Sequence, residues 1–132
     1  MIVLDTNIVL DAFLFNDPAA QPLKEALAAR QFQWIATLAM RDELARVLTY
    51  PKIVVRLVFY QRTAADVLAL FDAQVQLVGV ALKATLICAD SDDQKFIDLA
   101  VAHKARLLSK DRAVFCMAKR LLTVGVVMQK VI

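Results

Sequence analysis

Glycine and proline are scarce in this sequence, with 2 glycines and 3 prolines among 132 residues. Average proteins contain about 7% glycine and about 5% proline, so a low-complexity linker or a chain dominated by turns is excluded. A dinucleotide-binding fingerprint or a P-loop needs several glycines in one turn, because backbone N–H groups must approach phosphate closely. Gly79 and Gly125 stand far apart, which excludes both kinds of nucleotide site.

Cysteine and histidine are equally sparse. Cys88, Cys116 and the single histidine, His103, form neither a CxxC motif nor a Cys/His cluster. Structural zinc and a disulfide framework are therefore not expected, and free thiols fit a reducing compartment. Without a second histidine, a metal site must be built from oxygen atoms, which favours magnesium, manganese or calcium over zinc.

Long uncharged runs are absent too. No stretch approaches the roughly 18 residues that a membrane-spanning helix requires. The first residues form an apolar strand pattern and lack the basic start of a signal peptide. We therefore expect a cytoplasmic protein that does not engage a membrane.

Apolar residues, by contrast, are abundant. They make up 60% of the chain, and the mean hydropathy is +0.57. This length and content predict one domain, residues 1–132, with a large core and an apolar surplus that a second copy or another protein could cover. The net charge of +3 permits a polyanionic partner.

Apolar runs alternate with helical periodicity along the chain. Strands are expected at 1–4, 33–36, 76–80, 106–109 and 124–128. Helices are expected at 8–15, 22–29, 37–50, 53–60, from 63 onward, at 91–103 behind a Ser91/Gln94 capping box, and at 112–122. This alternation predicts a three-layer α/β/α fold around a parallel sheet of four or five strands. Ligands of such sheets bind at the carboxyl ends of the strands.

Two aspartates stand at that edge of the predicted sheet. Asp5 ends the first buried strand, and Asp111 follows the strand that finishes at Ser109 by two residues. Aspartate is also a common turn and helix-capping residue, so each position alone is open to that interpretation.

Glu43 borders the apolar stripe of the helix expected at 37–50. Met40, Leu44 and Val47 belong to this stripe, whereas the neighbouring Asp42 points away from it. A glutamate at the margin of a core can also extend its carboxylate into solvent, and that reading stays open.

Asp93 projects with Phe96 and Ile97 from the core face of the helix expected at 91–103. In the first turn its negative charge is favoured by the helix macrodipole. Asp90 and Asp92 lie close by, as caps and solvated charges or as outer ligands that reach a metal through water.

Four carboxylates at one edge would repel one another and raise each other's pKa values unless a cation neutralised them. A shell of carboxylates and water suits one or two magnesium or manganese ions. Two such ions can clamp the attacking and leaving oxygens of a phosphodiester displacement, which needs neither histidine nor a glycine loop.

These residues resemble a known family over essentially the whole chain. The opening VLDTN at residues 3–7 is similar to the first strand and D-T-N signature of PIN domains. The second-acid helix of the family resembles residues 37–53, and the S-x-D after its fourth core strand resembles residues 109–111. The segment CADSDDQKF at residues 88–96 is similar to the C-x-D-x-D-D-x-K-F stretch of one bacterial branch, the toxin components of toxin–antitoxin pairs.

The resemblance implies a Mg²⁺- or Mn²⁺-dependent endoribonuclease with an antitoxin partner. A homodimer or larger oligomer is also expected, because the apolar surplus could cover such an interface. The metal-binding and catalytic residues that it implies are Asp5, Glu43, Asp93 and Asp111. Supporting polar roles fall to Asn7, Thr6 and Ser109. Lys110 departs from the family pattern, which has glycine or a small residue there.

Basic residues next to these acids are candidates for contacting RNA phosphates. They are Arg41, Arg46, Lys110 and Arg112, each of which can also be an ordinary solvated charge.

Other functions remain open at this point. A phosphatase-type enzyme would have an acid in place of Asn7, and a receiver-like signalling domain would have adjacent acids after the first strand, where Thr6 stands. A PIN fold could also serve as a non-catalytic module that binds RNA or protein. Divalent-metal binding distinguishes this last possibility from a nuclease.

Overall fold

The computed structural model describes residues 1–132 and contains five parallel strands. Strands β1 (Ile2–Leu4), β4 (Arg106–Leu108) and β5 (Met128–Gln129) form one sheet in the order β1-β4-β5. Strands β2 (Ile35–Ala36) and β3 (Gln76–Leu77) pair beside it, and a parallel bridge between Ile2 and Trp34 joins the two parts. The order is therefore β3-β2-β1-β4-β5, which confirms the predicted parallel sheet.

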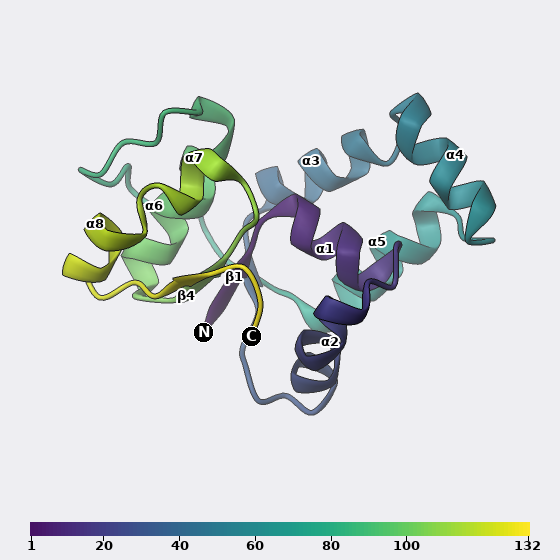
Figure 1. The fold of residues 1–132 in the computed structure, drawn as a ribbon, viewed down its shortest axis with the longest axis horizontal. Coiled ribbons are helices and arrows are strands. Elements are labelled where there is room, and N and C mark those ends of the chain that lie inside the picture. Colours follow the sequence, from purple (N-terminus) through teal and green to yellow (C-terminus); the bar gives the residue numbers. More distant parts are fainter.

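Eight α-helices surround these strands. They are α1 (Thr6–Phe13), α2 (Gln21–Ala28), α3 (Leu38–Val47), α4 (Pro51–Phe59), α5 (Ala64–Gln74), α6 (Gln94–His103), α7 (Arg112–Phe115) and α8 (Ala118–Thr123). Short 3₁₀ turns, η1 (Pro18–Ala20) and η2 (Ser91–Asp93), precede α2 and α6. Figure 1 shows α6, α7 and α8 on one side of β1 and β4, with α1, α2 and α5 on the other. The expected three-layer arrangement is thus confirmed, and none of the helices combines the length and apolar character needed to cross a membrane.

The start of α6 differs from the expected capping box. Asp90, not Ser91, caps the turn, because its Oδ1 accepts the N–H of Asp92 at 2.9 Å. The Gln94 side chain instead accepts the N–H of Cys88 at 2.6 Å and donates to the carbonyl of Leu86 at 2.9 Å. Gln94 thereby satisfies backbone groups of Leu86 and Cys88, in the part of the 78–90 connection that pairs with no strand.

The helix expected at 112–122 is interrupted. The N–H of Met117 bonds to the carbonyl of Val114 at 2.9 Å, three residues back, which tightens the chain between α7 and α8. The α-helical pattern resumes where Leu121 bonds to Met117 at 2.8 Å. All three side chains remain buried despite the break.

The core lies between the helix layers and on both faces of β1. Trp34 is 2% exposed, stacks on Phe13 with ring centroids 5.8 Å apart, and meets Phe71 edge-on at 5.0 Å. This packing assigns Trp34 to the core and removes it as a surface for stacking bases.

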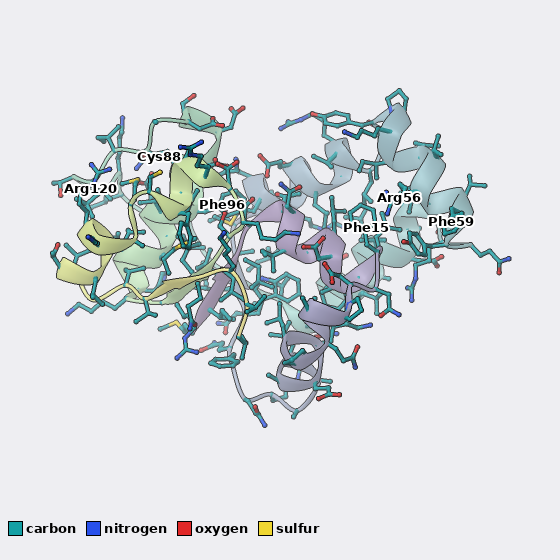
Figure 2. The ribbon with its side chains drawn as sticks, viewed as in Figure 1. Phe15, Arg56, Phe59, Cys88, Phe96 and Arg120 are labelled. Carbon is teal, nitrogen blue, oxygen red and sulfur yellow. The ribbon has the colours of Figure 1, made fainter.

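Helix α4 presents an apolar surface to solvent. Val55, Val58 and Phe59 are 67%, 73% and 75% exposed, and we call these three residues the α4 face. Beside it, the Arg56 guanidinium lies 4.7 Å from the centroid of the Phe15 ring, and Figure 2 shows these side chains where α4 lies beyond α1. This cation–π contact fixes α4 against Phe15. The α4 face takes no part in the contact and stays exposed.

Candidate metal centre

The parallel register of β1 and β4 places Asp5 beside Ser109. Leu4 pairs with Leu108, and the Asp5 N–H continues the ladder to the Leu108 carbonyl at 3.0 Å. The next residue of each strand therefore leaves the sheet at the same edge. There the Ser109 hydroxyl donates to Asp5 Oδ2 at 2.7 Å.

Asp5 is a buried carboxylate, with 4% of its surface exposed. Burial raises its pKa because a charge is poorly solvated there, while the hydrogen bond from Ser109 partly opposes this increase. The neighbouring charges of Glu43 and Asp111 raise the pKa further. Asp5 therefore lies in a site that is short of positive charge.

Asp93 ends the η2 turn and is 8% exposed. Its Oδ2 is buried and has no hydrogen-bond partner. Burial, followed by the charges of Asp5, Asp111 and Asp90, raises its pKa to about 7. The prediction that the helix macrodipole keeps this carboxylate ionised is therefore wrong, because burial and the neighbouring acids outweigh the dipole and leave Asp93 only partly ionised at neutral pH.

Asp111 combines a capping role with a place in the acidic group. Its Oδ1 accepts the N–H of Ala113 at 2.8 Å at the start of α7. Its own N–H donates to the Ser109 hydroxyl at 3.0 Å. The capping interpretation is thus correct for Asp111, and it fixes the side chain close to Asp93, whose pKa it raises.

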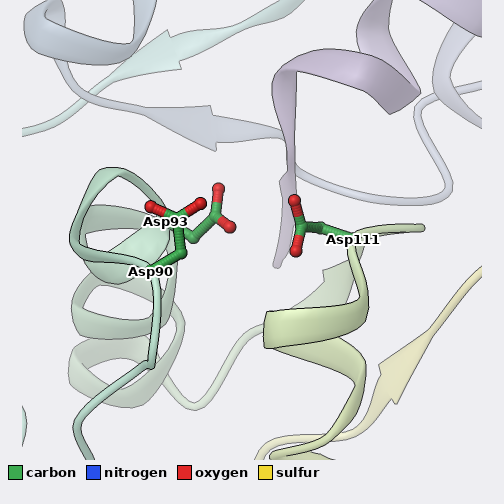
Figure 3. A group of neighbouring side chains, drawn as sticks. All are labelled: Asp90, Asp93 and Asp111. Atoms are coloured by element: carbon green, nitrogen blue, oxygen red, sulfur yellow. The ribbon is translucent and has the colours of Figure 1, made fainter.

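Asp90, Asp93 and Asp111 form a group that could hold a metal ion. One carboxylate oxygen from each lies within 4.8 Å of the others. In Figure 3, Asp90 and Asp93 extend from the η2 turn toward Asp111, which comes from the segment before α7. Ligands of an octahedral magnesium ion at about 2.1 Å are about 3–4.2 Å apart, so a small closure suffices. The unpaired, buried Asp93 oxygen fits a cation ligand.

Glu43 lies near Asp5, and both of its carboxylate oxygens already accept hydrogen bonds. The Thr6 hydroxyl donates to Glu43 Oε2, and the Lys95 ammonium donates to Glu43 Oε1 at 2.7 Å. Its charge affects the pKa of Asp5, so the fourth predicted acid does lie near the first. Both of its oxygens, however, are held by protein groups.

The other polar residues predicted to support the site differ in whether they contact its carboxylates. Ser109 and Thr6 each hold a carboxylate of the site, whereas Asn7 is exposed. Asp92 is also exposed, and its carbonyl accepts a hydrogen bond from Lys95.

Two of the four basic candidates have acidic partners. The Arg41 guanidinium forms two hydrogen bonds with Asp72, at 2.7 and 2.8 Å, which link α3 to α5. Lys110 pairs with Asp11 and is therefore not simply solvated. Arg46 and Arg112 are exposed and form no ion pair.

Lys95 is the site residue that sequence reasoning missed. It approaches Glu43 across 52 positions of sequence. The lysine stands within the C-x-D-x-D-D-x-K-F stretch, but a charge on a helix of unknown orientation does not indicate which carboxylate it meets.

A sequence model of the PIN domain matches residues 1–113. The chain belongs to the PIN domain family. Its fold is also similar to the crystal structure of VapBC2 from Rickettsia felis bound to a DNA fragment from their promoter, with a TM-score of 0.65 and 18% sequence identity over 97% of each chain. No curated protein sequence matches the chain significantly. In this PIN domain the acidic group lies where β1 and β4 end, as the parallel topology predicts for a ligand site.

Proposed function

We propose that this PIN domain is a metal-dependent endoribonuclease that hydrolyses RNA phosphodiester bonds. The observation that supports this most is the unpaired, buried Oδ2 of Asp93 next to two other aspartates. Buried carboxylates without a counter-charge are unfavourable. A centre that concentrates them is best explained by a bound cation.

Asp90, Asp93 and Asp111 would hold Mg²⁺ or Mn²⁺, with Asp5 as the adjacent carboxylate. Bound there, the ion would polarise a phosphoryl oxygen and lower the pKa of water. Ser109 orients Asp5 and the Asp111 backbone at once, through its hydrogen bonds at 2.7 and 3.0 Å. The carboxylates are thus fixed before substrate arrives, which reduces the reorganisation that the reaction requires.

The RNA backbone would be held by side chains rather than by a glycine-rich loop. Arg46 and Arg112 are exposed and can contact phosphates directly. Arg41 and Lys110 would first have to exchange Asp72 and Asp11 for phosphate. We therefore assign the larger contribution to Arg46 and Arg112.

The decisive experiment is cleavage of a mixed RNA pool in Mg²⁺ or Mn²⁺, with sequencing of the product ends. Asp93→Asn and Asp111→Asn should reduce the rate by about 100-fold or more, and a chelator should abolish cleavage. Asp42→Asn is the matched control, because this exposed carboxylate lies next to Glu43 on α3. Equal cleavage by folded Asp93→Asn and wild type would contradict the assignment.

A binding function without catalysis is the alternative that the exposed α4 face favours. Calorimetry separates the two proposals. A folded protein that binds no Mn²⁺ and cleaves no RNA would support a module that binds RNA or protein.

The branch that the sequence resembles also points to a toxin controlled by an antitoxin. The α4 face supplies an apolar surface, and the same segment carries three exposed basic residues, Lys52, Arg56 and Arg62. An antitoxin segment with an apolar stripe flanked by acidic residues would complement this surface. Co-expression with the product of a neighbouring small open reading frame tests whether such a partner suppresses toxicity.

A further inference from the structure

The protein holds the ammonium group of Lys95 in a defined position beside the acidic group. It donates to Glu43 Oε1 at 2.7 Å and to the carbonyl of Asp92, and it lies 4.9 Å from the centroid of the Phe96 ring. The Lys95 side chain is 29% exposed and that of Glu43 is 14% exposed. Three kinds of electron-rich group thus surround one partly desolvated ammonium.

Both carboxylate oxygens of Glu43 accept hydrogen bonds in this arrangement. One oxygen accepts from Lys95 and the other from the Thr6 hydroxyl. The oxygens that converge on a possible ion come from Asp90, Asp93 and Asp111 and do not include Glu43. Glu43 could ligate a metal only after losing the Lys95 interaction, and removing one partner of a partly buried ion pair is unfavourable.

We infer that Lys95 is a resident cation that takes the place of a second metal ion, so that the centre binds a single divalent ion at Asp90, Asp93 and Asp111. This inference rests on the proposed metal-dependent function and specifies its ion count. Lys95 neutralises Glu43, and the divalent ion neutralises the aspartates. Two-metal sites need carboxylates free to face both ions, and Glu43 is not free in this arrangement.

Removing the ammonium should create a second ion site. Lys95→Met keeps much of the length and apolar stem of the side chain while deleting the charge, which frees Glu43 Oε1. Lys95→Arg preserves a positive charge at the same place. Combining Lys95→Met with Glu43→Gln removes both the ammonium and the carboxylate that it exposes.

Calorimetric titration with Mn²⁺ and electron paramagnetic resonance of the bound ion measure the count without reference to cleavage. We expect one Mn²⁺ per chain for wild type and Lys95→Arg, two with a coupled-pair spectrum for Lys95→Met, and one again for the double variant. Circular dichroism establishes that each variant is folded, and Lys95→Gln replaces Lys95→Met if that variant unfolds.

The outcomes separate this inference from the proposed function. Two ions in wild type, or a single ion in the folded variant that lacks the ammonium, would overturn the resident-cation role and leave metal-dependent cleavage intact. No Mn²⁺ binding in wild type would overturn both.

Discussion

Ser109 connects two acids from opposite ends of the chain: its hydroxyl donates to Asp5 Oδ2 at 2.7 Å and accepts the N–H of Asp111 at 3.0 Å. The residue is fully buried. Its hydroxyl therefore stabilises the buried Asp5 carboxylate and also holds the segment before α7 in place.

Ser109→Ala should lower both stability and cleavage. Asp5 would lose its hydrogen-bond donor in a buried place, at a cost of about 1–3 kcal/mol in the free energy of unfolding. Misorientation of Asp5 should slow cleavage by about 10–100-fold. Denaturant unfolding and RNA cleavage rates measure the two effects. Thr85→Ala, at an exposed position in the 78–90 connection, is the control and should change neither.

The metal-free protein should lose stability as the pH rises. Burial and the neighbouring acids raise the pKa of Asp93 to about 7, above the usual 3.8, so the folded state binds this proton more tightly than the unfolded state. The corresponding stability is present below pH 4 and is lost as the pH rises to 7. In chelator, Tm should be lower at pH 8 than at pH 5, and Mg²⁺ should restore it.

Asp93→Asn should remove much of this pH dependence while slowing cleavage by about 100-fold or more. At pH 8 in chelator the variant should gain about 1 kcal/mol over wild type, allowing for solvent screening, or about 3–5 °C in Tm. Asp42→Asn should keep the wild-type profile. A variant no more stable than wild type at pH 8 would show that Asp93 is not under electrostatic strain.

The sequence predicts the edge of the site better than its interior. Asp5 and Asp111 follow from strand ends, because parallel topology brings those ends together whatever the helices do. The contacts of Glu43 do not follow from the helical wheel, since the wheel places a residue on a face and leaves its partner undefined. Lys95, the partner of Glu43, and Asp72, the partner of Arg41, each lie on a distant helix whose orientation the local pattern does not specify.

The predicted capping box at the start of α6 was wrong for a related reason. The Ser91/Gln94 spacing fits a capping box, but the Gln94 side chain instead bonds to the backbone of Cys88 and Leu86, two residues of the 78–90 connection that pair with no strand. Buried backbone groups need hydrogen-bond partners, so a long-range hydrogen bond can replace the one that a local motif would form.

Core and surface aromatics should respond very differently to truncation. Trp34→Ala should destabilise the protein by about 3–5 kcal/mol, since the ring is buried between Phe13 and Phe71. Phe59→Ala should cost less than about 1 kcal/mol, because that ring is 75% exposed. Chemical unfolding of the two variants compares them directly. Similar losses would mean that the α4 face is covered in solution, for example by a second copy.

Charging the α4 face should separate inhibition from catalysis. The double variant Val55→Lys/Val58→Lys adds charge at two exposed positions outside the acidic group. The protein should therefore fold, and its RNA cleavage rate should stay within about twofold of wild type. Binding of a co-expressed antitoxin should weaken by about 100-fold or more, because its apolar stripe would meet desolvated ammonium groups. Titrating purified antitoxin into the cleavage assay measures this loss as a shift in the inhibitory concentration. Val54→Lys, at the flank of the same helix, is the comparison. Undiminished inhibition of the double variant would place the antitoxin on another surface.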